Sequence, residues 1–176
     1  MSVSLRCYST SLGCPKNRVD TERLLGSLGV ALVPVESPDE AELVFINTCA
    51  FIQPATEESV RTIAQAIADI EELPKRPLLA VAGCLVGRYH AEDLAPELPE
   101  VDLWLDNSDL EAWPAMLARK LGLPEPTVPG RILSTGPSYA WLKISDGCRH
   151  ACSFCAIPNI RGGHRSHCKD MIVREA

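Results

Sequence analysis

Short apolar segments alternate with segments of helical periodicity over most of the chain, and this alternation limits the possible folds more than any other feature. Five segments have the apolar character and length of buried strands: 5–10, 31–33, 43–47, 78–82 and 103–105. Segments of helical spacing lie between them. Strands that alternate with helices are typical of βαβ units. The sequence therefore predicts an α/β domain built on a doubly wound parallel sheet.

Three helices are expected between and after these strands. The first begins near Asn17 and ends at Gly29, since glycine commonly follows the last helical residue. The second covers about 54–73, where Val60, Ile63 and Ile67 share one face. The third covers about 110–121 and ends at Gly122. Pro114 weakens its first turn unless the helix begins there.

The composition changes after residue 122. Segment 123–138 is rich in proline and glycine, as linkers are, and 140–144 reads as a new strand followed by a loop and a helix from about Lys169. One strand-loop-helix unit cannot bury its own apolar face, and a (β/α) barrel needs about 200 residues or more. We therefore expect a complete domain over 1–122, a linker over 123–138, and the first β-loop-α unit of a truncated barrel over 139–176.

Charge and hydropathy exclude several classes of protein. The 176 residues contain no apolar stretch near the ~20 residues of a membrane span, and the N-terminus has no signal-peptide core, so we expect a cytoplasmic protein. The first 138 residues carry 11 Lys and Arg against 20 Asp and Glu. Such an acidic body is a poor match for a phosphate backbone, which makes a nucleic-acid partner unlikely for this segment.

A first set of cysteines stands at the ends of predicted strands. Cys14, Cys49 and Cys84 each follow a strand and precede a helix. Such positions lie at the carboxyl edge of a parallel sheet, so the three thiols can converge, and nearby helix N-termini would lower their pKa. Three thiolates fit an iron–sulfur cluster with one open iron, or a zinc ion with one open position. Alternatively, the three are separate buried cysteines that act as small hydrophobes.

A second set follows the predicted strand at 140–144. Cys148, Cys152 and Cys155 form a C-x3-C-x2-C run in one loop. Three ligands again leave one iron open to chelate a substrate or cofactor. A closed zinc site is the alternative. Its fourth ligand would be one of three nearby residues, namely His164, His167 or Cys168.

Other residues of this loop are open to two interpretations each. Phe154 is either part of a core or packs against a planar ring of a bound cofactor. Arg161 and Arg165 are expected to be solvated, or to make contacts of the kind made to phosphate, with no special role unless an anionic cofactor lies beside them. Cys7 lies within the first strand and is expected in the core.

Both cysteine sets resemble those of the radical S-adenosylmethionine methylthiotransferases. The C-x3-C-x2-C run with an aromatic residue before its third cysteine is the radical S-adenosylmethionine motif, and the three upstream contexts narrow the likeness to methylthiotransferases. Segment 11–17, Ser-Leu-Gly-Cys-Pro-Lys-Asn, followed by Asp-Thr-Glu at 20–22, is similar to the branch that modifies a ribosomal protein. Segments 47–52, 83–85 and 156–158 point the same way.

The resemblance implies two 4Fe–4S clusters and S-adenosylmethionine as cofactors. Cys148, Cys152 and Cys155 would hold the cluster that binds S-adenosylmethionine, with Phe154 as a contact of that cofactor. Cys14, Cys49 and Cys84 would hold the auxiliary cluster that carries the donated sulfur. The implied reaction adds a methylthio group to the β-carbon of an aspartate in the twelfth small-subunit ribosomal protein, with flavodoxin or ferredoxin as electron donor.

The resemblance also implies that most of the catalytic barrel lies outside these 176 residues, so we expect the chain to be inactive alone. Two other functions stay open from the sequence. One is a methylthiotransferase of the same chemistry that acts on an adenosine of transfer RNA. The other is a non-catalytic zinc-binding or redox module.

Overall fold

A five-stranded parallel sheet forms the centre of the computed structural model, which describes residues 4–176. The strand order is β2-β1-β3-β4-β5, and every neighbouring pair is parallel. The strands are β1 (Ser4–Ser11), β2 (Ala31–Pro34), β3 (Leu43–Thr48), β4 (Leu78–Gly83) and β5 (Leu103–Asp106). All five predicted strands and the doubly wound parallel sheet are confirmed.

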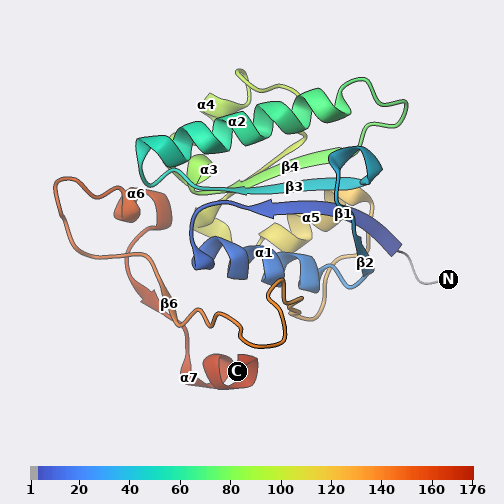
Figure 1. Cartoon of the computed structure of the whole chain (residues 1–176). Helices are drawn as coiled ribbons and strands as arrows, with labels where there is room; N and C mark the ends of the chain where they lie inside the picture. Colours follow the sequence, from blue (N-terminus) through green and yellow to red (C-terminus); the bar gives the residue numbers. More distant parts are fainter. Residues whose placement is uncertain (1–3) are drawn as a thin grey trace.

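Helices cover both faces of the sheet (Figure 1). Those that connect the strands or follow the last one are α1 (Pro15–Ser27), α2 (Gln53–Ile70), α3 (Cys84–Tyr89), α4 (Ala91–Leu94) and α5 (Trp113–Leu121). The three predicted helices are α1, α2 and α5, and Pro114 does mark the start of α5. The sequence did not reveal α3 and α4, because helices of 6 and 4 residues are too short to show a period.

Alternating side chains of the central strands build two cores. Val44 and Ile46 of β3 face α2, whereas Leu43 and Phe45 face α1 and α5. Cys7 is buried in the second core, as expected, and burial raises the pKa of its thiol to about 12. The period of two along each strand therefore assigns one face to each helix layer.

The chain after α5 has little regular structure and lies beside α1 (Figure 1). The predicted strand over 140–144 is wrong. Instead, β6 (Ser145–Asp146) pairs antiparallel with β7 (Arg165–Ser166). A strand needs a neighbour for its backbone hydrogen bonds, and no other strand in residues 4–176 pairs with 140–144. The helix predicted from Lys169 is confirmed as α7 (Lys169–Glu175), and α6 (Ile157–Arg161) lies between the two short strands.

The expected linker packs closely on α1. The Ser27 hydroxyl accepts a hydrogen bond from the Gly130 amide at 3.0 Å, and the Ile132 amide donates to the Glu22 carbonyl at 3.0 Å. A Cβ added to Gly26 would lie 2.4 Å from the Arg131 amide nitrogen, so only glycine permits this approach. Residues 130–134 thus follow the surface of the helix. The division at residue 122 stays a prediction.

No helix within residues 4–176 combines the length and the apolar composition that crossing a bilayer requires.

Candidate functional site

The first cysteine set lies at the carboxyl edge of three adjacent strands. Cys14 is the N-cap of α1 directly after β1, Cys49 follows β3, and Cys84 is the first residue of α3 directly after β4. Since the sheet order runs β1-β3-β4, the three loops are neighbours. In this order the topological switch point lies between β1 and β3, where ligand sites form in open α/β sheets. The predicted placement of the three cysteines at one edge is confirmed.

Two of these thiols interact directly. A hydrogen bond from the Cys84 thiol lowers the pKa of Cys49 to about 6. The same bond, together with burial, raises the pKa of Cys84. The expectation that helix N-termini lower the pKa of all three is therefore wrong for Cys84, where hydrogen bonding and burial outweigh the helix. Two amide side chains also meet the Cys84 sulfur, namely Asn17 through its Oδ1 at 3.8 Å and Asn107 through its Nδ2 at 3.7 Å.

Cys14 completes the set from an exposed position. Within residues 4–176, no three Cys, His, Asp or Glu side chains are arranged as they stand so that they could hold one metal ion. The donors nevertheless fit an iron–sulfur cluster, because thiolates are its usual ligands and three of them border one edge. Asn107 also keeps a buried Oδ1 without a hydrogen-bond partner there.

Asn17 ties the loops of the first set together. It is fully buried, and its Nδ2 donates to the Leu12 carbonyl and to the Thr48 carbonyl, both at 2.8 Å. The Asn47 side chain donates to the Asn17 carbonyl at 2.9 Å. Asn17 therefore links the backbone at the end of β1 to the backbone at the end of β3. An amide side chain suits this position because it has both donor and acceptor atoms.

Cys49 is held in place by Ser59 of α2. The Ser59 hydroxyl accepts from the Cys49 amide at 3.0 Å and donates to the Cys49 carbonyl at 2.7 Å. Thr48 acts similarly for the next loop, since its hydroxyl donates to the Ala82 carbonyl at 2.6 Å and accepts from the Leu85 amide at 3.1 Å. Buried hydroxyls thus orient the backbone at Cys49 and at the start of α3.

Gly13 leaves room for Cys49. Its φ is +82°, and an added Cβ would lie 2.5 Å from both Cβ and Sγ of Cys49. We expect Gly13→Ala to displace the Cys49 side chain and to cost more stability than backbone strain alone, which is about 1 kcal/mol. Gly29→Ala is the matched control, because Gly29 has φ +67° with open space around it. Urea unfolding of both variants measures the difference, and equal losses would contradict the steric role of Gly13.

The second cysteine set lies in the loop between β6 and α6. The Cys148 amide donates to the Gly162 carbonyl and the Cys155 amide donates to the Cys152 carbonyl, both at 3.1 Å, so the loop closes on itself. Phe154 is 87% exposed, which excludes a place in the core. Its contact with S-adenosylmethionine stays a prediction. Of the residues considered as a fourth zinc ligand, His164 and Cys168 are exposed and His167 is half-buried.

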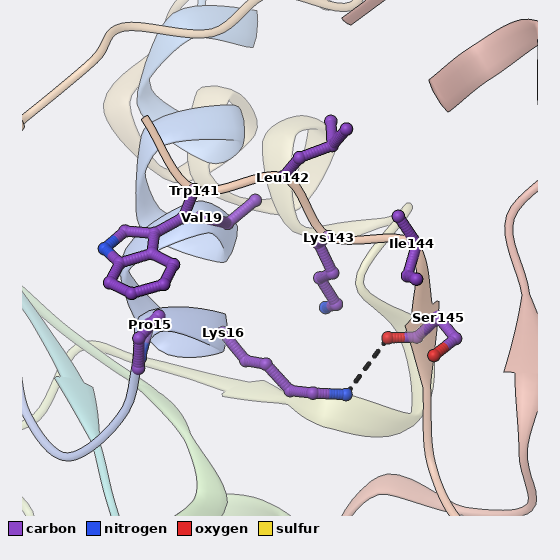
Figure 2. A pocket seen from close by; sticks show the side chains of 8 residues that line it. All are labelled: Pro15, Lys16, Val19, Trp141, Leu142, Lys143, Ile144 and Ser145. Atoms are coloured by element: carbon purple, nitrogen blue, oxygen red, sulfur yellow. Dashed lines mark hydrogen bonds between the residues drawn. The ribbon is translucent and has the colours of Figure 1, made fainter. Parts of the chain in front are cut away.

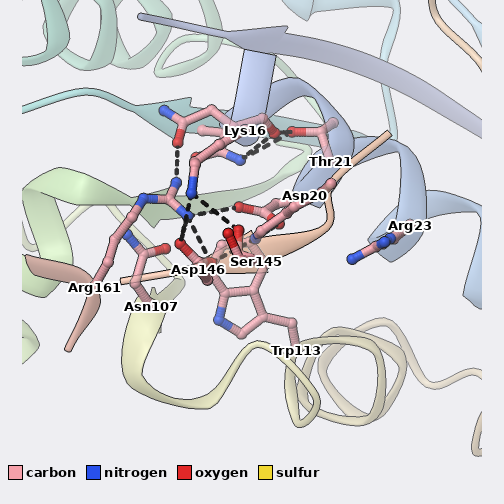
Figure 3. Close-up of polar contacts among 12 residues, drawn as sticks. Lys16, Asp20, Thr21, Arg23, Asn107, Trp113, Ser145, Asp146 and Arg161 are labelled. Atoms are coloured by element: carbon pink, nitrogen blue, oxygen red, sulfur yellow. Dashed lines mark hydrogen bonds and ion pairs between the residues drawn. The ribbon is translucent and has the colours of Figure 1, made fainter. Parts of the chain in front are cut away.

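A buried group of four charges joins this loop to α1, and Figure 3 shows three of them, Asp20, Asp146 and Arg161. Arg161 pairs with Asp20 at 3.2 Å and with Asp146 at 3.0 Å. Lys143 contacts the same two carboxylates at 2.5 and 2.6 Å. All four side chains are at most 7% exposed. The expectation that Arg161 is solvated is therefore wrong, whereas Arg165 is exposed as expected.

The charges within this group balance, and each is stabilised by its neighbours. Burial disfavours ionisation of Asp146, but the charges of Arg161 and Lys143 hold the pKa of that carboxyl well below its usual range. Likewise, burial opposes protonation of Arg161, while the charges of Asp20 and Asp146 raise its pKa. Asp146 and Arg161 therefore stabilise each other's charged forms.

A second balanced group involves Glu22 and Arg23, two and three positions after Asp20 in α1. Glu22 pairs with Arg131 at 2.7 Å, Arg131 pairs with Glu175 at 2.8 Å, and Arg23 pairs with Glu175. Burial opposes ionisation of Glu22, but hydrogen bonds from Ser134 and the Arg131 charge lower its pKa. The sequence analysis missed both groups. The one signal was the acidic pair of residues 20 and 22 inside a helix that also packs a core.

The first turn of α1 and residues 141–145 enclose a small open pocket (Figure 2). Lys16 crosses it and donates to the Ser145 carbonyl at 3.0 Å. Its volume is about 150 Å³, well below the roughly 300–1,000 Å³ of ligand pockets. We regard this pocket as a packing gap between α1 and residues 141–145.

Comparison with known proteins gives one family and several relatives. The model of the family described as Uncharacterized protein family UPF0004 matches residues 6–106. Proteins named "Ribosomal protein uS12 methylthiotransferase RimO" from Nitratidesulfovibrio vulgaris and Oleidesulfovibrio alaskensis are 71% and 64% identical over 96% of this chain. One of the same name from Lawsonia intracellularis is 56% identical over 99% of it.

These relatives are longer than the chain. It covers 39% of the first two and 40% of the third. It therefore spans about two fifths of the length of the curated relatives that it matches.

Proposed function

The chain belongs to the Uncharacterized protein family UPF0004, and on that premise we propose that it is the N-terminal part of a radical S-adenosylmethionine methylthiotransferase. The proposed reaction adds a methylthio group to the β-carbon of an aspartate in the small-subunit ribosomal protein uS12. The observation that carries this proposal is the gathering of Cys14, Cys49 and Cys84 at one sheet edge, next to a docked loop that carries a second cysteine triplet. The names of the relatives support the substrate.

We assign the ligands by set. Cys148, Cys152 and Cys155 would hold a 4Fe–4S cluster that serves S-adenosylmethionine, and Phe154 offers an exposed ring beside them. The other three cysteines would hold the auxiliary 4Fe–4S cluster. When bound, these groups supply the electron and the radical that remove hydrogen from an unactivated carbon, which acid–base catalysis cannot do.

The residues of this chain would prepare both sites. Asn17, Thr48 and Ser59 fix the backbone that presents the first set. The Nδ2 of Asn107 donates toward the Cys84 sulfur at 3.7 Å, and hydrogen bonds of this kind tune iron–sulfur centres. The proposed partners are the ribosomal protein and a flavodoxin or ferredoxin as electron donor. We place the reaction in the cytoplasm, where eight free thiols stay reduced, with neither membrane nor nucleic acid as a partner of this segment.

Two alternatives are less well supported. A transfer RNA methylthiotransferase would share the chemistry, but the relatives reported above are named for a ribosomal protein substrate. A zinc-binding or redox module would share the thiols. Structural zinc sites are closed tetrahedra of four ligands, however, and each set supplies three cysteines. Metal analysis distinguishes this second alternative directly.

The test is anaerobic reconstitution of the chain with ferrous iron and sulfide. We expect about eight irons per chain and a broad absorption near ~400 nm, whereas zinc gives no colour. Changing Cys14, Cys49 and Cys84 together to Ala should remove about four irons. Cys168→Ala is the matched control, since Cys168 is exposed and outside both sets. Zinc without iron would contradict the proposal.

The substrate needs a separate measurement in the organism that encodes the chain. With Cys49→Ala in the gene, we expect the aspartate peptide of the ribosomal protein to lose the mass increment of one methylthio group. A modified peptide in that strain would refute the assigned role of Cys49, and its absence in the unaltered strain would refute the substrate.

A further inference from the structure

Arg161 connects the two cysteine sets physically. It ends α6, directly after the loop of the second set, yet its guanidinium lies at the edge of the first set. Nη2 donates to the Asn17 Oδ1 at 2.5 Å, and that same oxygen lies 3.8 Å from the Cys84 sulfur. The Asn17 oxygen thus bridges the Arg161 guanidinium and the Cys84 thiol.

The backbone around Arg161 makes the same connection. The Ile160 side chain is 2% exposed and belongs to the core under α2. A Cβ added to Gly87 of α3 would lie 2.6 Å from the Ile160 carbonyl oxygen, so α6 abuts the helix that begins with Cys84. An arginine that served only as a surface charge would have no reason to be buried beside a thiol pair.

The geometry points to Arg161 as a positioning residue that holds the loop of the second cysteine set against the first set and places a fixed positive charge beside the Cys84 sulfur. Its planar fork suits this task, because one edge binds two carboxylates while the other reaches the Asn17 amide. The holding role rests on the contacts of Arg161 with Asp20, Asp146 and Asn17. The charge role rests on the proposed function, since it concerns a sulfur that would bind iron.

Hydrogen exchange of the metal-free chain tests the holding role. In Arg161→Met we expect the amides of 157–162 to exchange roughly tenfold faster or more, since breaking a buried charge group opens the segment locally, while β3 keeps its protection. Arg161→Lys should retain part of the protection. Arg165→Met is the matched control and should change nothing, because Arg165 is an exposed arginine four residues away. Unchanged exchange in Arg161→Met would overturn the holding role.

The conservative variant keeps this test decisive. If Arg161→Met also lost protection in β3, Arg161→Lys would carry the test, because it retains the charge and shortens only the fork. In that case, faster exchange confined to 157–162 in Arg161→Lys supports the holding role, and exchange equal to the unaltered chain refutes it.

The charge role has a spectroscopic readout. With Cys148, Cys152 and Cys155 changed to Ala, any reconstituted iron–sulfur centre belongs to the first set. We expect Arg161→Met to shift its reduction potential to more negative values, because a nearby positive charge favours the reduced state, while Arg161→Lys and Arg165→Met stay close to the parent. An unshifted potential would refute the charge role alone. Failure of the parent to bind iron would refute the proposed function and the charge role with it, and would leave the exchange result standing.

Discussion

Phe45→Ala is expected to lower the free energy of unfolding by about 3–5 kcal/mol, the usual cost of emptying a large aromatic site in a core. Phe45 lies in the middle of β3, is fully buried, and packs between the sheet and the α1 and α5 layer. The strands on both sides of β3 limit how far the backbone can close the cavity. Urea unfolding followed by circular dichroism measures the loss.

Phe51→Ala provides the control for this change. Phe51 follows Cys49 by two positions and is 43% exposed, so its truncation should cost within about 0.5 kcal/mol. Similar losses for the two phenylalanines would show that the core does not lie where the structure places it.

Asp20→Ala is expected to weaken the docking of the segment after α5 by about 3–5 kcal/mol, because it leaves Lys143 and Arg161 buried with a single carboxylate between them. The sheet itself should stay folded, since nearly all of its core residues precede residue 122. Hydrogen exchange over 143–162 measures the loss. Exchange as slow as in the unaltered chain would contradict this account of the buried charges.

Two controls make the Asp20 result specific. Asp69→Ala, on the exposed face of α2, should cost within about 0.5 kcal/mol. The double change of Asp20 to Ala and Arg161 to Met should cost less than the sum of the single changes, since it removes one charge of each sign and leaves Lys143 paired with Asp146. Additive losses would mean that Asp20 and Arg161 act independently.

The strands were predictable because their signal is local. Residues 43–48 are fully buried, so the sequence there is a continuous apolar run that ends in polar residues at the sheet edge. The placement of Cys14, Cys49 and Cys84 follows from that same local signal combined with a parallel topology. The helix ends at Gly29 and Gly122 were also predictable, because glycine commonly follows the last helical residue. Both glycines have the positive φ that this position requires.

The charge groups were not predictable for the opposite reason. Asp20 and Arg161 are 141 positions apart, and no periodicity relates them. Arg161 looks like any surface arginine in a loop of polar and glycine residues, and only tertiary contact reveals its burial. The strand at 140–144 failed similarly, because its apolar pattern is local but strand formation depends on a partner.

Both faces of α1 make contacts, and from this we expect an order of assembly during synthesis. Its apolar residues Leu24, Leu25 and Leu28 join the sheet core, and its polar residues hold a segment more than 100 positions later. The core side can form before Lys143 and Arg161 have been synthesised, so Asp20 and Glu22 would first be hydrated. The segment that contains Arg131 and Arg161 then binds to an α1 surface that is already folded. The cysteine loop of the second set is consequently fitted onto a first set whose framework is already folded.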